Sequence, residues 1–147
     1  MAGTKNGPEL HPTTLELAQG PNFAAITTAM PGGDFQTHYI WAGTDGERLF
    51  VNTEVHCQKY KSVERDPRVT LTIRDEQDPY HYAEVRGEVV QTVTGEEARG
   101  HIDELSQKYN GEPYPPDPFK TERVTLWIVP SRQTAVGSGP EEALPTD

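Results

Sequence analysis

The chain has 147 residues, enough for one domain, and its 13 Lys and Arg against 23 Asp and Glu give a net charge of -10. This charge argues against general binding to nucleic acids or anionic membranes, so any anionic ligand must be held by a local cationic patch. Cys57 is the one cysteine, which excludes an internal disulfide and fits a reducing compartment.

Hydrophobic residues make up only 33% of the chain, and 13 prolines and 13 glycines indicate many turns. So thin an apolar supply favours a small core that a partner subunit completes. No apolar run approaches the roughly 20 residues that cross a bilayer, and the opening residues MAGTKNGPEL lack the apolar core of a signal peptide. We therefore expect a cytoplasmic protein.

The two ends of the chain have the composition of loops. Residues 1–12 and 137–147 are rich in Pro, Gly and acidic residues. This predicts a flexible N-terminus and a disordered acidic tail on either side of one domain, which spans 13–136.

A short helix and three strands are expected in the first third of the domain. Thr13 or Thr14 caps a helix that runs to Gln19. β-branched and alternating apolar residues, separated by Gly-rich turns, then predict a meander of three strands over residues 22–30, 35–43 and 48–53.

The middle of the chain is expected to contain a short helix and two strands. The helix covers roughly 57–64, with an apolar stripe of Cys57, Tyr60 and Val63. The strands cover 69–73 and 80–93. The second strand is long, and Gly87 within it suggests a bulge or a sharp barrel corner.

The clearest helix follows, and a final strand closes the domain. Thr94 and Glu97 form a capping box at the start of the helix, and Asn110-Gly111 ends it. The strand covers 123–130, with apolar residues on both faces. Six or seven strands with one late helix predict a mainly β domain, and the long bent strand favours a Greek-key barrel over a sandwich.

Standard catalytic and metal motifs do not occur in the sequence. The five histidines lie apart, and His56 and Cys57 are neighbours, a poor spacing for two ligands on a regular element, so no metal site is predicted. Cys57 falls on the apolar stripe of its helix, which favours a structural thiol over a nucleophile.

The segment TEVHCQKYKSVERDPR, residues 53–68, concentrates cations in this acidic chain. Thr53 ends a strand, and the helix that follows carries Lys59 and Lys61. A hydroxyl, a lysine and the free N–H groups of a helix N-terminus together make a phosphate site. The alternative is a solvated helix face, on which the lysines serve only solubility.

From Asn22 to Pro130 the chain resembles a known family. The resemblance depends on NFAAITT, a strand ending in HYIW, LFVNT, QKYKSVERDPRVTLTI, DPYHYAEVRGEV and LSQKYNGEPYP, in this order. These motifs are similar to those of the flavin and deazaflavin oxidoreductases with the pyridoxamine-phosphate-oxidase-like split barrel, specifically the actinobacterial class that uses coenzyme F420.

The resemblance implies a homodimer with the cofactor in a groove between the subunits. It places the deazaflavin ring against the second strand and the cofactor phosphate where the third strand meets the next helix. It also implies that two tyrosines of the DPYHY block wall the pocket, from this chain or its partner, although both could be ordinary strand aromatics. The residues so assigned to cofactor binding are Gln36, Thr37, His38, Tyr39 and Ile40 of the second strand, Thr53, Gln58 and Lys59 at the phosphate with Lys61 behind them, Asn52 and Cys57 in the same strand–helix connection, and Tyr80 and Tyr82 in the wall.

One position departs from the family pattern. Many relatives have arginine two places before the phosphate lysine, where this chain has Cys57. The resemblance implies hydride transfer from reduced coenzyme F420 to an electron-poor acceptor, with Tyr82, His38 or solvent as the proton source. FMN in place of F420 and a non-catalytic cofactor-binding protein are the two alternatives.

Overall fold

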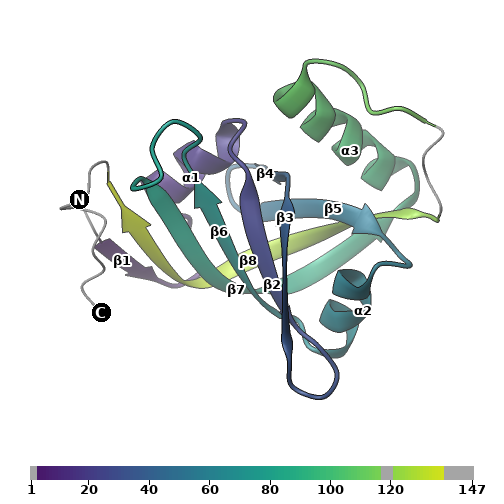
Figure 1. Cartoon of the computed structure of the whole chain (residues 1–147), viewed down its shortest axis with the longest axis horizontal. Helices are drawn as coiled ribbons and strands as arrows, with labels where there is room; N and C mark the ends of the chain where they lie inside the picture. The colour runs from purple at the N-terminus through teal and green to yellow at the C-terminus, as the bar shows by residue number, and fades with distance from the viewer. Residues whose placement is uncertain (1–2, 117–120, 138–147) are drawn as a thin grey trace.

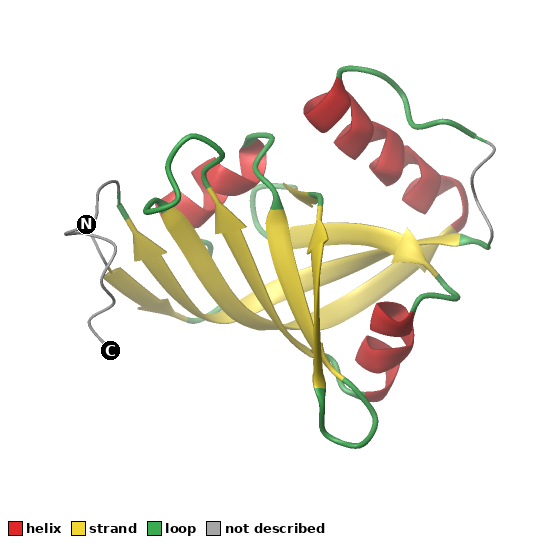
Figure 2. Ribbon diagram, in the orientation of Figure 1, coloured by secondary structure: helices red, strands yellow, loops and turns green. Residues whose placement is uncertain are grey.

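Antiparallel strands are the main elements of the structure, a computed structural model that describes residues 3–116 and 121–137 (Figures 1 and 2). The elements in chain order are β1 (Gly3–Asn6), α1 (Pro12–Gln19), β2 (Ala24–Ala29), β3 (Phe35–Ile40), β4 (Ala42–Thr44), β5 (Leu49–Glu54), α2 (Gln58–Arg65), β6 (Arg68–Arg74), β7 (Tyr82–Thr94), α3 (Gly95–Asn110) and β8 (Arg123–Val136).

The strands form one sheet in the order β3-β2-β6-β7-β8-β5-β4, with β1 paired to β8. The two end strands, β3 and β4, are separated in the chain only by Trp41, so the sheet curls back on itself as a barrel. This confirms the mainly β fold with a barrel architecture.

The predicted three-strand meander is wrong in its last pairing. β2 pairs with β3 as predicted. β5, however, does not pair with β3; its neighbours are β8 and β4. The chain leaves the direction of β3 at Trp41, whose indole stacks on Tyr109 of α3 with 5.2 Å between ring centroids. β5 then pairs with β8, which is apolar on both faces and is buried from Val124 to Ile128.

The predicted bulge at Gly87 is confirmed. The pairing of β7 with β8 shifts register between Arg86 and Gly87 and again between Val89 and Gln91. A Cβ atom at position 87 would clash with the backbone oxygen of Val129. Glycine is therefore required here because the two strands cross too closely for a side chain.

Two apolar clusters form the core. The larger one fills the barrel with residues such as Ile26, Leu71 and Ile128, and leucines on and before α1 close one end. The smaller cluster lies between α3 and the outer face of β5 and β8, and consists of Phe50, Ile102, Leu105 and Trp127.

The helix ends differ from expectation in two places. His11, not Thr13 or Thr14, caps α1, because its Nδ1 accepts a hydrogen bond of 3.0 Å from the Thr13 amide. Thr94 is the N-cap of α3, but its side chain makes no capping hydrogen bond, so the capping box does not form. Gly111, in the left-handed conformation, ends α3 as predicted.

Part of the N-terminal segment that was expected to be flexible forms a strand. Gly3–Asn6 form β1, which pairs antiparallel with β8 so that Asn6 lies opposite Arg132. The predicted acidic tail, from residue 138 on, lies outside the described residues. Among the helices described, none has the length and apolarity that crossing a membrane requires.

Candidate cofactor-binding site

The connection from β5 to α2 carries the predicted phosphate site. Cys57 is the N-cap of α2, and its side chain makes no capping hydrogen bond. The first turn of the helix contains no acidic residue. The first N–H groups of a helix have no intrahelical partners and carry partial positive charge, so this end of α2 can accept an anion.

Two half-buried cations lie beside this helix end. The ammonium of Lys59 donates a hydrogen bond of 3.3 Å to the Thr53 hydroxyl. Burial lowers the pKa of Lys59; the nearby Cys57 opposes this effect, and the charge of Arg123 adds to it. Burial also lowers the pKa of Arg123. Each guanidinium or ammonium group gives up hydration here, which an anionic ligand would restore as direct contacts.

The positive charge of Lys59 also acts on His38 of β3. Burial lowers its pKa, and Lys59 lowers it further. The imidazole is therefore neutral at pH 7. Lys59 thus contacts Thr53 of β5, and its charge acts on His38 of β3 and on Arg123 of β8.

The sequence analysis missed Arg123. Its Nε donates a hydrogen bond of 2.8 Å to Asn52 Oδ1, and its guanidinium lies 5.6 Å from the centroid of the Tyr114 ring. Asn52 is itself fixed, since its Nδ2 donates to Ala98 O and Thr125 Oγ1, both at 2.9 Å. The one sequence signal was an arginine at the start of an otherwise apolar strand.

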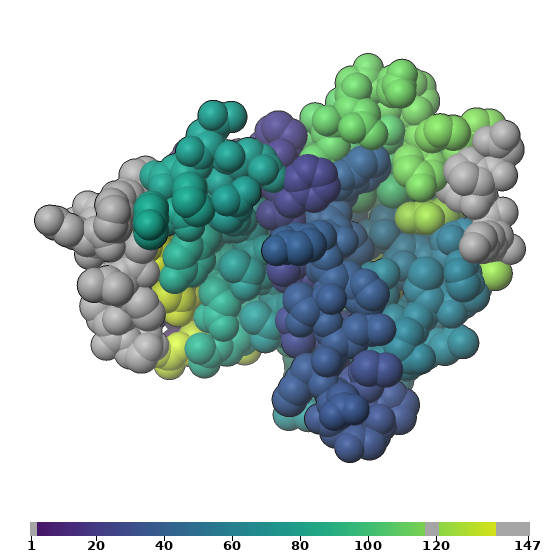
Figure 3. Space-filling view, in the orientation of Figure 1, coloured from purple at the N-terminus to yellow at the C-terminus, as the bar shows by residue number. Residues whose placement is uncertain are grey.

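A cavity of about 250 Å³ adjoins these polar groups. Asn52 and Arg123 are the polar residues of its wall. The rest of the wall consists of aromatic and aliphatic side chains: Phe23, Tyr39, Ile40, Trp41, Ile102, Leu105 and Tyr114. Figure 3 shows a yellow-green part of the chain, near the start of β8, exposed between green α3 and the blue strands. An apolar cavity with a few convergent polar groups is typical of a small-molecule site.

The sequence matches the pyridoxamine 5'-phosphate oxidase family over residues 10–136. The chain belongs to this family. The resemblance drawn from the sequence motifs is thereby confirmed, and the barrel described above is the split barrel.

Solved structures agree with this membership. A structure described as an F420 reductase is 27% identical to the chain, with a TM-score of 0.75 over 84% of this chain and 98% of that one. Two other structures have the same fold. A conserved hypothetical protein from Mycobacterium tuberculosis is 22% identical, with a TM-score of 0.64 over 97% of this chain and 94% of that one. The general stress protein 26 of Bacillus anthracis is 16% identical, with a TM-score of 0.62 over 84% of this chain and 91% of that one. No curated protein matches the sequence.

In this member of the pyridoxamine 5'-phosphate oxidase family, the predicted ring residues of β3 divide between two faces. Gln36, His38 and Ile40 are half-buried, whereas Thr37 and Tyr39 are exposed. Thr37 bonds to the Thr27 hydroxyl at 2.8 Å. The buried Oε1 of Gln36 has no hydrogen-bond partner within residues 3–116 and 121–137, which leaves an acceptor for a ligand donor.

The remaining predicted residues do not all reach the site. Lys61 is exposed, and Gln58 directs its amide nitrogen to the Ser62 hydroxyl at 3.1 Å. Tyr80 and Tyr82 lie near the end of β6 that is opposite α2, because Arg74 pairs with Tyr82 (Figure 1). A seven-residue strand spans roughly 20 Å, so within one subunit these tyrosines are remote from Lys59.

Proposed function

We propose that the protein is an oxidoreductase that binds reduced coenzyme F420 and delivers a hydride to an electron-poor small molecule, such as an enone, quinone, tetrapyrrole or nitroaromatic. The observation that supports this most is the half-buried pair of Lys59 and Arg123 at an open helix N-terminus, next to an aromatic cavity. The similarity to an F420 reductase over almost all of that chain adds to it.

The residues present fit such a cofactor. Lys59, the Thr53 hydroxyl and the first N–H groups of α2 would hold its phosphate. Gln36 Oε1 would accept a hydrogen bond from a ring donor, and Ile40 and Trp41 would exclude water. When bound, the reduced coenzyme supplies the hydride, while the protein provides orientation and a dry site.

Solvent is the proton source that agrees best with the geometry. His38 is neutral at pH 7, because burial and Lys59 both lower its pKa. A neutral imidazole whose pKa lies below 6.5 is a weak general acid at that pH. Tyr82 lies at the far end of the sheet within one subunit, so it could act only from a partner.

We also propose a homodimer that completes the site. The cavity of about 250 Å³ falls below the roughly 300–1,000 Å³ typical of ligand pockets. Phe35 and Tyr39 project from β3 with 76% and 85% of their surfaces exposed. Such exposed aromatics on one strand face indicate an interaction surface.

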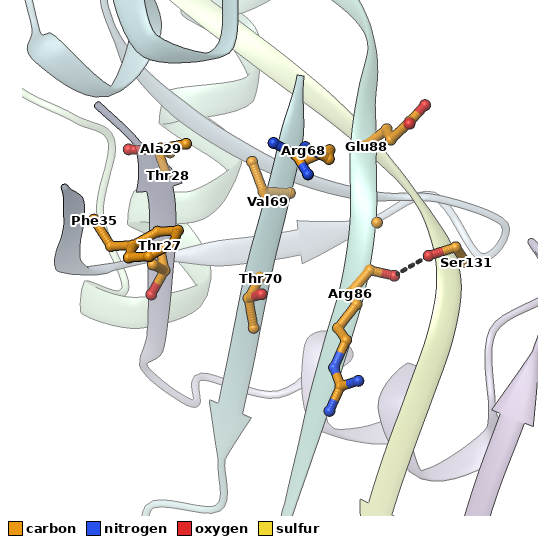
Figure 4. Close-up of a pocket in the computed structure, with 11 residues that line it drawn as sticks. Thr27, Thr28, Ala29, Phe35, Arg68, Val69, Thr70, Arg86, Glu88 and Ser131 are labelled. Carbon is orange, nitrogen blue, oxygen red and sulfur yellow. Dashed lines mark hydrogen bonds between the residues drawn. The ribbon is translucent and has the colours of Figure 1, made fainter. Parts of the chain in front are cut away.

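A shallow groove of about 390 Å³ lies on the outer face of β2, β6 and β7, beside Phe35. Figure 4 shows small side chains, such as Thr27 and Thr70, within it, and Arg86 and Glu88 on the neighbouring strand. A face with both charge signs around small residues can pair with a copy of itself, as an isologous dimer requires.

FMN is the second candidate cofactor, because it also carries a phosphate and the chain belongs to the pyridoxamine 5'-phosphate oxidase family. Equilibrium titration of the purified protein with coenzyme F420 and with FMN separates the two. We expect saturable binding of F420, at least tenfold tighter than that of FMN. Tight FMN binding with no F420 binding would overturn the proposal.

A further inference from the structure

Three potential metal ligands of different types meet in the turn between β5 and α2. Glu54, His56 and Cys57 each offer one ligand atom, and the three atoms lie within 4.8 Å of one another. From this geometry we infer that the three side chains form a binding site for a divalent transition metal of the zinc class. The proposed function assigns no metal to this turn.

The distances suit such an ion. Cys57 Sγ lies 3.9 Å from His56 Nε2. Zinc lies about 2.3 Å from thiolate sulfur and about 2.0–2.1 Å from imidazole nitrogen, which at a tetrahedral angle separates the two ligand atoms by roughly 3.5 Å. Side-chain rotations would have to bring all three ligand atoms, which lie within 4.8 Å of one another, to about this separation.

The neighbouring positions of His56 and Cys57 count against a shared metal only on a regular element. Successive side chains of a strand point to opposite faces. These two residues instead lie in a turn, in which the Cys57 amide donates a hydrogen bond of 3.0 Å to Glu54 O. That bond folds the chain back and brings the three ligands to one side.

Thr121 positions two of the three ligands. Its hydroxyl lies 2.7 Å from His56 Nδ1, and its amide donates to Glu54 Oε1 at 3.2 Å. When Nδ1–H donates to this hydroxyl, Nε2 carries the lone pair and is the ring nitrogen that lies 3.9 Å from Cys57 Sγ. Metal-binding histidines usually have such a partner on the second ring nitrogen, which fixes the tautomer and the ring orientation.

The ligand set favours zinc over magnesium or calcium. Thiolate and imidazole are soft or borderline ligands, whereas magnesium and calcium prefer oxygen atoms alone. Metal binding displaces the Cys57 proton to solvent and leaves the thiolate bound to the metal. Three protein ligands leave a fourth position for water or an exchangeable ligand.

Anaerobic titration of the full chain with Zn²⁺ and Co²⁺ tests the site. We expect one Zn²⁺ per chain, no competition by Mg²⁺, and a thiolate-to-cobalt charge-transfer band with Co²⁺. Cys57→Ser should abolish the band and weaken Zn²⁺ binding at least tenfold. His56→Gln and Glu54→Gln should also weaken binding, whereas His81→Gln, a control in another turn, should not.

Thr121→Val separates positioning from ligation. It should weaken Zn²⁺ binding about 10- to 100-fold but keep the charge-transfer band, because the thiolate still binds. Matching thermal unfolding of each metal-free variant shows that the fold is intact; if Cys57→Ser does not fold, alkylation of wild-type Cys57 replaces it. The inference would be overturned if the wild type does not bind Zn²⁺ saturably, or if the protein without the Cys57 thiol binds Zn²⁺ as tightly as the wild type. Neither outcome depends on whether the protein binds F420.

Discussion

Lys59 and Arg123 bring two positive charges together in partly buried surroundings, which costs free energy in the unliganded protein. Burial lowers the pKa of both groups; the Lys59 ammonium donates to the Thr53 hydroxyl, and Arg123 Nε donates to Asn52 Oδ1. Such perturbed groups beside a cavity are typical of functional sites.

Replacement of Lys59 tests the phosphate site at the scale of one residue. Lys59→Met should weaken F420 binding by about 1.5–3 kcal/mol, or roughly 10- to 150-fold, because it removes a charge-assisted contact. Lys61→Met is the matched control, since Lys61 is exposed on the same helix, and its affinity should match the wild type. Equal affinities in all three proteins would make Lys59 an ordinary surface charge.

Sequence reasoning found the part of this site that lies in one segment and missed the part that depends on strand pairing. Thr53 and Lys59 are six positions apart in one strand–helix connection. Arg123 reaches the same place only because β5 pairs with β8, with Glu54 opposite Arg123. That register depends on long-range packing, which local periodicity does not reveal.

At the scale of elements, the crossing of β7 and β8 determines how the barrel bends. Gly87→Ala should destabilise the protein by about 1–3 kcal/mol, because its Cβ would strike the backbone of Val129, which cannot move aside as a side chain can. Chemical denaturation measures the change in the free energy of unfolding.

Gly100→Ala provides the control for Gly87→Ala. Gly100 lies within α3, and a Cβ there would meet no atom within 4 Å. Alanine should therefore stabilise the helix by about 0.5–1 kcal/mol. A Gly87→Ala variant as stable as the wild type would contradict the account of the strand crossing.

Lys108 links α3 to the rest of the fold, and its burial should make stability depend on pH. Its ammonium donates to Ala18 O and Ala42 O, and burial lowers its pKa to about 8, from 10.5. Between these values the unfolded chain binds more protons than the folded one, so stability should rise with pH across this window.

The free energy of unfolding between pH 8 and pH 9.5 should therefore rise more steeply in the wild type than in Lys108→Met. The titration of one group can change the slope of the free energy of unfolding against pH by at most about 1.4 kcal/mol per pH unit, and solvent screening reduces this change. Lys61→Met should keep the wild-type slope. Parallel curves for the wild type and Lys108→Met would exclude this titration.

At the scale of the whole molecule, composition and alternation sufficed for a mainly β barrel, but the strand order did not follow from them. The sheet closes because the chain turns at Trp41 onto Tyr109 of α3, a contact between residues far apart in the sequence. Sequence reasoning was limited in the same way for Tyr80 and Tyr82, because their distance from the site depends on strand order. They would approach the site only from a second subunit.

Phe35→Asp tests the proposed dimer face. Light scattering with size-exclusion chromatography should show a dimer for the wild type and a monomer for this variant, because a carboxylate replaces an aromatic ring that is 76% exposed in the single chain. Val90→Asp, at another exposed apolar position (54% exposed), should stay dimeric. A monomeric wild type, or a Phe35→Asp dimer as stable as the wild type, would reject this face.

Anaerobic turnover of reduced coenzyme F420 tests the central claim most directly. The protein is mixed with the reduced coenzyme and a panel of quinones, enones and nitroaromatics, and the absorbance of oxidised F420 is followed over time. We predict acceptor-dependent oxidation that falls at least tenfold in Lys59→Met at subsaturating coenzyme and is unchanged in Lys61→Met. Intact F420 binding without oxidation by any acceptor would contradict the account and indicate a cofactor-binding protein that is not an enzyme.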